Sequence, residues 1–184
     1  MSGQQSEVTV RPARVADAGT VAEIHVRSWQ RAYRGMLLDS VLDSLSIREW
    51  TAKRRKFLKQ KTHEQRYWVV ETNDVLRGFM DSGASRDQDA PASQGVAEIW
   101  AMYVHPESWG QGLGQALMAH CLDDLRARHW RQVILWVLDD NRQARQFYQA
   151  AGFRADGASR PDSFRGSSWT DVRYTLELGP RHRQ

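Results

Sequence analysis

Several features that define large protein classes are scarce in this chain. Cys121 is the only cysteine among 184 residues, which excludes an intrachain disulfide and a zinc site built from several thiolates. The longest apolar runs fall far short of the roughly 20 residues that a membrane-spanning helix needs, and the segment 1–7 is polar. We therefore expect no signal peptide, no membrane partner, no metal and a reducing, cytoplasmic location.

Linkers and internal repeats are also missing. At 41% hydrophobic residues, a chain of this length can bury one full core. We expect a single domain over residues 1–184, with its core at about 8–178.

Lysine is scarce, although the chain is basic. The net charge of +4 comes from 22 arginines and 4 lysines against 22 acidic residues, and six of the nine residues at 53–61 are basic. This run is typical of the solvated face of a surface helix. An acidic acceptor, a nucleic-acid-associated substrate or the phosphates of a ligand would also fit it. No nucleic-acid-binding motif accompanies the run, so we do not expect a nucleic-acid partner.

Hydrophobic periodicity gives an ordered series of elements. Strands are predicted at 8–11, 66–72, 75–82, 96–104, 132–138, from 153 onward and at 169–178, and helices at 18–33, 38–45, 47–61, 113–128 and 141–151. Asn73-Asp74 indicates a hairpin turn. Residues 83–95 and 159–168 are polar and predict loops, the first of them mobile. Cys121 falls on the apolar stripe of its helix and is expected to be buried.

The most informative segment is a glycine cluster between a strand and a helix. Gly110, Gly112 and Gly114 follow the apolar run 96–104, and a helical pattern begins at Gln115. A strand, a glycine-rich turn and a helix N-terminus together bring several backbone N–H groups onto one anion, typically a phosphate. A tight turn without a ligand is the alternative. The spacing is neither that of a P-loop nor that of a dinucleotide-binding fingerprint.

A second motif makes the glycine cluster more specific. The cluster resembles motif A of the GNAT acetyltransferase superfamily, Arg/Gln-x-x-Gly-x-Gly/Ala. The segment 141–153, NRQARQFYQAAGF, resembles its motif B, Asn-x-x-Ala-x-x-Phe-Tyr-x-x-x-Gly-Phe, one helix and one strand later. The resemblance covers about residues 8–178. It implies an α+β (α/β GNAT) fold, with a mixed, mostly antiparallel sheet of about six or seven strands flanked by about four helices.

The resemblance also implies a donor site for acetyl-CoA. The backbone N–H groups of residues 109–114 would hold the pyrophosphate, and Trp109 stands where the family usually has Arg or Gln. A β-bulge in the strand 96–104 would expose an N–H near Met102 or Tyr103 to the acetyl oxygen. The full predicted donor site is Met102, Tyr103, Val104, Trp109, Gly110, Gln111, Gly112, Leu113, Gly114, Asn141, Arg142 and Tyr148.

Two residues are candidates for proton transfer. Tyr148 matches the motif B tyrosine that protonates the departing thiolate in many relatives, although its helical spacing also suits a core aromatic. Glu98 lies in an Ala-Glu-Ile segment like that of the histone acetyltransferase branch, and a carboxylate in an apolar strand suits a general base. An exposed acid on a strand face is the alternative for Glu98. Asn141 fits a helix cap as well as a ligand contact.

The acceptor site is predicted on the first helix. His25, Trp29 and Tyr33 fall at i, i+4 and i+8 and would form one wall, which would favour an amine on an aromatic or extended body. Half-buried packing explains the same spacing.

Together these features predict an acyltransferase. It would move the acetyl group of acetyl-CoA to a primary amine of a small molecule, by direct attack in a ternary complex. A protein or peptide acetyltransferase acting on lysine or an N-terminus is one alternative, and a non-catalytic acyl-CoA-binding sensor is another. Homodimers are common among relatives, so a dimer would fit. The sequence leaves the acceptor and the length of the acyl group open.

Overall fold

The computed structural model describes residues 7–179, so the outermost residues of the predicted domain, including most of the polar N-terminal segment, lie outside the described residues. The strands are β1 (Val8–Pro12), β2 (Arg66–Thr72), β3 (Val75–Ala84), β4 (Val96–Val104), β5 (Gln132–Leu138), β6 (Arg154–Phe164) and β7 (Ser167–Glu177). The α-helices are α1 (Ala18–Ala32), α2 (Asp39–Asp43), α3 (Ile47–Gln60), α4 (Leu113–Ala127) and α5 (Arg142–Ala150). The described part thus has the five α-helices that the hydrophobic periodicity predicts. This is one more than the roughly four that the family resemblance implied, because the short α2 counts separately from α3.

The seven strands form one sheet in the order β1-β2-β3-β4-β5-β7-β6. Only β4 and β5 run parallel, and the other neighbours are antiparallel. The mixed, mostly antiparallel sheet predicted from the sequence is confirmed. Asn73 and Asp74 connect β2 to β3 with φ values of 49° and 63°, as the primed turns of tight hairpins require.

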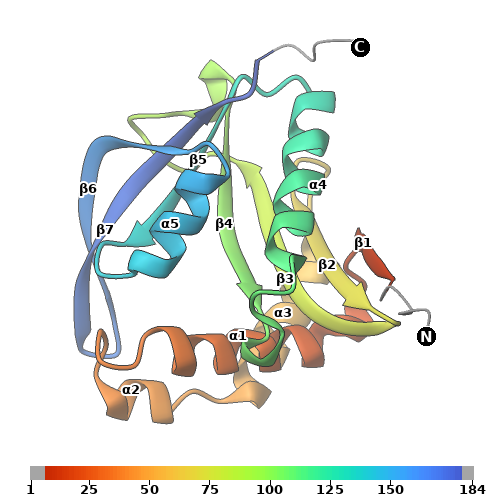
Figure 1. Cartoon of the computed structure of the whole chain (residues 1–184), viewed down its shortest axis with the longest axis vertical. Coiled ribbons are helices and arrows are strands. Elements are labelled where there is room, and N and C mark those ends of the chain that lie inside the picture. The colour runs from red at the N-terminus through yellow and green to blue at the C-terminus, as the bar shows by residue number, and fades with distance from the viewer. Residues whose placement is uncertain (1–6, 180–184) are drawn as a thin grey trace, which may run out of the picture.

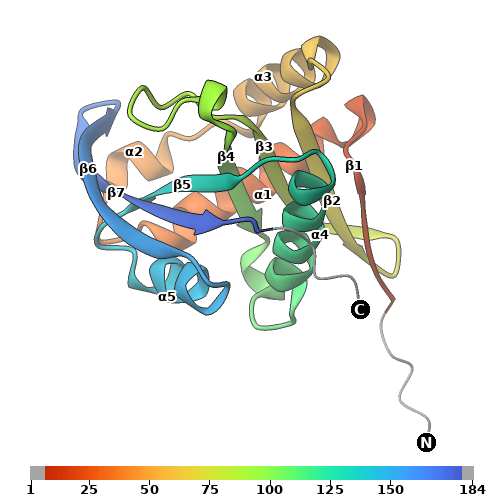
Figure 2. The same cartoon turned by 90° about the horizontal axis from the view of Figure 1, so that it is seen from above.

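Helices cover both faces of the sheet (Figure 2). The alternation along β2 shows how. Trp68 and Val70 belong to the cluster that includes the buried face of α4, whereas Tyr67 and Val69 pack with residues of α1. Figure 1 shows α4 and α5 on the face toward the viewer.

Cys121 lies inside the core, as predicted. It is fully buried on α4, with its Sγ 3.6 Å from the Oγ of Ser82. Burial raises the pKa of the thiol to about 12, so Cys121 stays protonated and has no nucleophilic character at neutral pH.

The basic run lies on α3, and most of its side chains face solvent. Lys53, Arg55 and Lys56 are exposed, while Arg54 turns inward and bonds to Asp81 on β3 at 2.5 Å. The interpretation as a solvated helix face therefore holds for most of the run. In the described residues no helix is both long and apolar enough to span a membrane.

The prediction of a polar loop at 159–168 is wrong. These residues form the turn end of a hairpin, in which β6 pairs with β7 and the chain turns at Arg165 and Gly166, both with positive φ. β6 is an edge strand with mostly exposed side chains. An edge strand tolerates polar residues and a proline such as Pro161, so its composition resembles that of a loop.

Candidate active site

The site begins where β4 and β5 separate. The two strands pair only from Val96 to Ile99. At that point the register of β4 against β3 shifts, so that Trp100 is an extra residue, which is the β-bulge that the family resemblance implied. Beyond Trp100 the strands diverge (Figure 1). Alternate N–H groups of β4 between Ala101 and Val104 therefore point into the gap without a strand partner.

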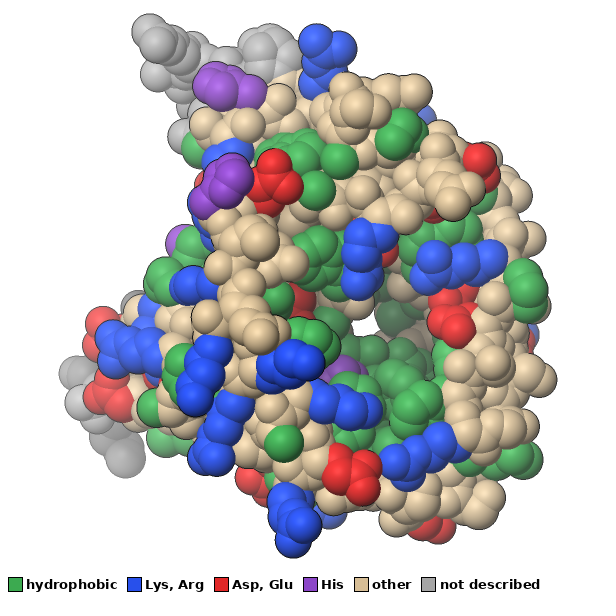
Figure 3. Space-filling model, turned by 180° about the vertical axis from the view of Figure 1, so that it is seen from behind, with side chains coloured by type: hydrophobic (Ala, Val, Ile, Leu, Met, Phe, Trp, Pro, Cys, Tyr) green, Lys and Arg blue, Asp and Glu red, His purple; other side chains and the backbone are tan. Residues whose placement is uncertain are grey.

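A cavity of about 660 Å³ occupies this gap. The wall of this cavity is formed by the glycine loop (residues 109–114), α5, α1 and the β6–β7 hairpin. In Figure 3 the hollow opens right through the molecule. The predicted site residues that line it are Trp29, Tyr33, Glu98, Met102, Tyr103, Val104, Trp109, Gly110, Gly112, Leu113, Gly114, Asn141 and Tyr148.

The glycine loop at one end of the cavity has the geometry of an anion site. Gly110 and Gly112 have φ values of 76° and 79°, and Gly112 is the N-cap of α4. The backbone N–H groups of residues 110–115 make no hydrogen bond within the described chain. These free donors and the positive end of the helix dipole converge on one place, as a pyrophosphate needs.

Trp109 has a different task from the Arg or Gln that the family usually has there. Its indole Nε1 donates to the carbonyl of Val104 at 2.7 Å. This bond fastens the loop to the last residue of β4. The indole therefore holds the main chain of the loop in place, and its one N–H is already bonded, which leaves the backbone N–H groups as the free donors of the loop.

Gly114 lets α4 approach the rest of the donor site. A Cβ at this position would stand 3.1 Å from Cε of Met102 and 3.2 Å from Cε2 of Phe147. These distances are shorter than ordinary van der Waals contacts. The free N–H groups, the close packing and the open slot between the strands fit an extended acyl-CoA.

Tyr148 projects from α5 into the same cavity. Asn141 caps the helix, its Oδ1 accepting from the N–H of Ala144 at 3.1 Å. The phenol of Tyr148 makes no hydrogen bond among the described residues. Burial, and then the neighbouring Tyr103, raise its pKa above the ordinary value. The hydroxyl is therefore protonated at neutral pH and free to donate.

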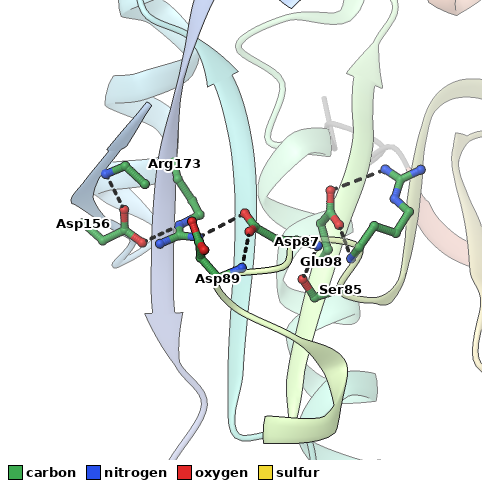
Figure 4. Close-up of polar contacts among 8 residues, drawn as sticks. Ser85, Asp87, Asp89, Glu98, Asp156 and Arg173 are labelled. Carbon is green, nitrogen blue, oxygen red and sulfur yellow. Dashed lines mark hydrogen bonds and ion pairs between the residues drawn. The ribbon is translucent and has the colours of Figure 1, made fainter. Parts of the chain in front are cut away.

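Glu98 is buried and holds the loop between β3 and β4. It accepts from the backbone N–H of Arg86 at 2.9 Å, and its other oxygen lies 3.4 Å from the Arg86 guanidinium. Figure 4 shows Asp87, next along the chain, turned away from Glu98 toward Arg173 of β7. The loop expected to be mobile is thus fastened at two points. The alternative of an exposed acid at position 98 is wrong.

Tyr103 is the centre of the aromatic wall. Its hydroxyl accepts from Nε1 of Trp29 at 3.0 Å and lies 3.4 Å from the hydroxyl of Tyr33. Burial raises the pKa of Tyr103. The aromatic wall therefore consists of Tyr103, Trp29 and Tyr33, whose uncharged side chains are joined by hydrogen bonds. Trp29 and Tyr33 belong to the line of residues that the sequence predicted for this wall.

His25, the third residue of that line, does not line the cavity. It is buried behind Tyr103, with ring centroids 4.6 Å apart, and also packs on Trp50 at 4.1 Å. Eight residues of helix span about 12 Å, and at the His25 end α1 already lies under the sheet. His25 is therefore not part of the acceptor wall, contrary to the prediction.

Gln111 and Arg142 also lie outside the cavity lining. The Gln111 amide donates to the carbonyl of Glu107 at 3.2 Å, and Arg142 is exposed on the first turn of α5. Arg145, three residues further along α5, bonds to Tyr174 at 3.1 Å.

Other lining residues were not identified from the sequence. Arg86, Trp136, Arg160, Asp162 and Asp171 all face the cavity. A tryptophan in an otherwise aliphatic strand and an aspartate in the alternating strand 169–178 were available signals, but neither indicates which face a strand turns to a site.

Comparison with known proteins agrees with this geometry. The acetyltransferase (GNAT) family matches residues 18–153. The N-acetyltransferase YuaI of Bacillus subtilis is 28% identical over 143 residues, which are 78% of each chain. The PaiA N-acetyltransferase of Thermoplasma acidophilum, solved with coenzyme A, superimposes with a TM-score of 0.73 at 20% identity, over 93% of this chain and 99% of that one. The yncA protein of Salmonella typhimurium, solved with acetyl-CoA, gives a TM-score of 0.70 at 21% identity, over 97% and 98%.

The chain belongs to the GNAT acetyltransferase family. It is an acetyl-CoA-dependent N-acetyltransferase, in which the loop at Gly110–Gly114 and helix α5 carry the two family motifs.

Proposed function

We propose that the enzyme transfers the acetyl group of acetyl-CoA to a primary amine of a small molecule, by direct attack while both are bound. One observation carries the proposal. A single cavity joins the free N–H groups of the glycine loop to the aromatic wall on α1, through the gap between β4 and β5. In the reaction the amine nitrogen bonds to the carbonyl carbon and the carbon–sulfur bond breaks. The nitrogen loses a proton, and the sulfur gains one.

Each of these steps has a candidate group in the chain. The N–H groups of residues 110–115 would hold the phosphates. An unpaired N–H near Met102 or Tyr103 would polarise the thioester carbonyl. The phenol of Tyr148 would donate its proton to the departing sulfur.

Glu98 is the proposed base. An alkyl ammonium with a pKa near 10 must lose a proton before the nitrogen can attack. Glu98 is buried, lines the cavity and lies two residues before the bulge at Trp100. Its carboxylate would accept the proton directly or through water.

The form of the cavity supports a small acceptor over a polypeptide. Phe164 and Trp169 of the β6–β7 hairpin and Leu37 before α2 close in on the aromatic wall. A free phenol at Tyr148 supports catalysis over a purely sensory role, because ligand binding alone does not need a proton donor.

A single domain over residues 1–184 and a cytoplasmic location stay predictions.

The substitution Tyr148→Phe tests the proposal. We expect turnover to fall by about a hundredfold, the scale of a lost general acid, while acetyl-CoA binding stays within about twofold because the ring remains. Thiol release and calorimetry measure the two effects.

Tyr174→Phe is the matched control. Tyr174 is a buried tyrosine outside the cavity lining, and its hydroxyl accepts from Arg145. Equal turnover losses in both variants would mean that Tyr148 has only a packing role.

A further inference from the structure

The acceptor half of the cavity combines aromatic walls with carboxylates. Trp29 of α1 faces Phe164 of the hairpin, with 5.7 Å between the ring centroids, and also packs on Tyr33, the residue after α1, at 5.3 Å. Asp162 and Asp171 of the same hairpin also line this half. Aromatic faces and carboxylates together favour a cation.

Asp171 is a buried carboxylate with incomplete charge compensation. It is 8% exposed, and its Oδ1 accepts from Nε1 of Trp169 at 2.8 Å. The nearest cation to Oδ2 is Nη2 of Arg160, 3.8 Å away, without a hydrogen bond between them. The Arg160 guanidinium instead stacks over the ring of Trp136 at 4.2 Å. One oxygen of Asp171 therefore lacks a close partner.

The charges along the cavity do not balance. Arg86 is paired with Glu98, so Arg160 is the one remaining cation among the lining residues, against the two carboxylates Asp162 and Asp171. Asp162 has no ion pair within the described chain, and its Oδ1 accepts from the N–H of Ser163. Burial, and also the neighbouring charge of Asp162, raise the pKa of Asp171. A cation bound here would relieve both costs.

This carboxylate pair is separate from the place of acetyl transfer. Asp171 pairs with Leu138 at the end of β5, three residues beyond Leu135, which is the last residue of β5 that pairs with β4. The amine that attacks the thioester must be neutral at that moment. A permanent cation held at Asp171 is therefore a second group of the acceptor.

We propose that Asp171, with Asp162 and the rings of Trp29, Tyr33 and Phe164, binds the distal cationic group of the acceptor, and that the acceptor is a diamine. This inference rests on the proposed transfer to a small amine. It names the substrate class of the same cavity.

Three acceptors of one chain length test it. 1,6-Diaminohexane, 1-aminohexane and 6-aminohexanoate have the same aminopentyl part and end in an ammoniomethyl, a methyl and a carboxylate group, respectively. We expect kcat/KM for the diamine to exceed that for the other two by at least about tenfold, the size of one charge-assisted hydrogen bond.

Asp171→Asn isolates the carboxylate, since the amide oxygen can still accept from Trp169. The preference for the diamine should shrink toward one, through a higher KM for the diamine and not through a lower kcat. Asp162→Asn, at an exposed position, should reduce the preference less. Glu177→Gln removes one exposed charge from the same strand, outside the cavity, and should leave the preference intact.

The outcomes separate the inference from the proposed function. Equal rates with all three acceptors, or a diamine preference that survives in Asp171→Asn, would overturn the cation site while amine acetylation stands. Preference for 6-aminohexanoate would overturn it in favour of Arg86 and Arg160. Bound acetyl-CoA with no amine-dependent thiol release would overturn both.

Discussion

The buried polar residues near the cavity differ in whether they have hydrogen-bond partners. Glu98 and Asn141 each accept a backbone N–H. In contrast, neither ring nitrogen of His25 has a hydrogen-bond partner in the described chain. Burial, and then the charge of Arg54, lower the pKa of His25 to about 3. His25 is therefore neutral and packs as an aromatic ring. Its helical spacing with Trp29 and Tyr33 suits a packing residue and a substrate-binding residue equally well, so the sequence alone could not distinguish the two roles.

His25 makes stability depend on pH. Its pKa is about 3 when folded and about 6.5 when unfolded. Below about pH 6.5 only the unfolded chain takes up the proton, so stability falls with decreasing pH until the folded pKa is reached. At pH 5 the loss is about 2 kcal/mol.

The substitution His25→Phe should remove this loss. Urea unfolding at pH 7.5 and pH 5 measures it, and His63→Gln, at an exposed position, is the control. If the difference in free energy of unfolding between the wild type and His25→Phe is the same at both pH values, His25 takes up its proton in the folded state as well, which would contradict the prediction.

Glu98 makes a prediction of a different kind, about rate. Glu98→Gln keeps an oxygen that can accept from Arg86 but removes the base, so turnover should fall by about a hundredfold. The remaining activity should rise with pH until the acceptor amine is deprotonated. The profile of kcat/KM from about pH 6 to pH 10 checks this against the amine pKa.

Glu23→Gln, at an exposed position on α1, controls for the loss of one negative charge. A Glu98→Gln profile with the height and form of the wild-type profile would remove Glu98 from the mechanism and leave water as the route for the proton.

At the scale of elements, local signals were predictable and pairings were not. The glycine loop and the Asn141 cap depend on residues a few positions apart, so the sequence predicted both. The β6–β7 hairpin depends on pairing with a strand whose own partner is β5. The loop before β4 is fastened by Asp87 to Arg173, 86 positions away. Contacts at such separation leave no periodic signal in the sequence.

The glycine loop gives a test at the scale of elements. Gly112→Ala places a side chain at a φ of 79°, which costs about 1 kcal/mol and disturbs the converging N–H groups. We expect acetyl-CoA affinity, measured by calorimetry, to fall at least about tenfold, as for one lost charge-assisted hydrogen bond.

Gly35→Ala is the matched control, because Gly35 has a φ of 81° and free space around it. Both variants should lose similar stability, and only Gly112→Ala should lose affinity. Equal affinity in the two would show that the loop does not bind the phosphates.

At the scale of the whole molecule, one divergence of strands produces the site. The sheet is continuous, yet β4 and β5 separate beyond Ile99. The glycine loop and α5 line this opening together with α1 and the β6–β7 hairpin. The sequence predicted the order of elements and the donor end. Of the acceptor end it predicted only Trp29 and Tyr33, because the rest of that wall comes from β5, β6 and β7, which are far from these residues in the chain.

The most direct test of this account is a calorimetric titration of acetyl-CoA into the wild-type enzyme, followed by thiol release on adding amines. The account predicts saturable binding of one acetyl-CoA per chain and release of thiol that depends on the amine. An absence of binding would contradict it, because the glycine loop would then be only a turn between β4 and α4.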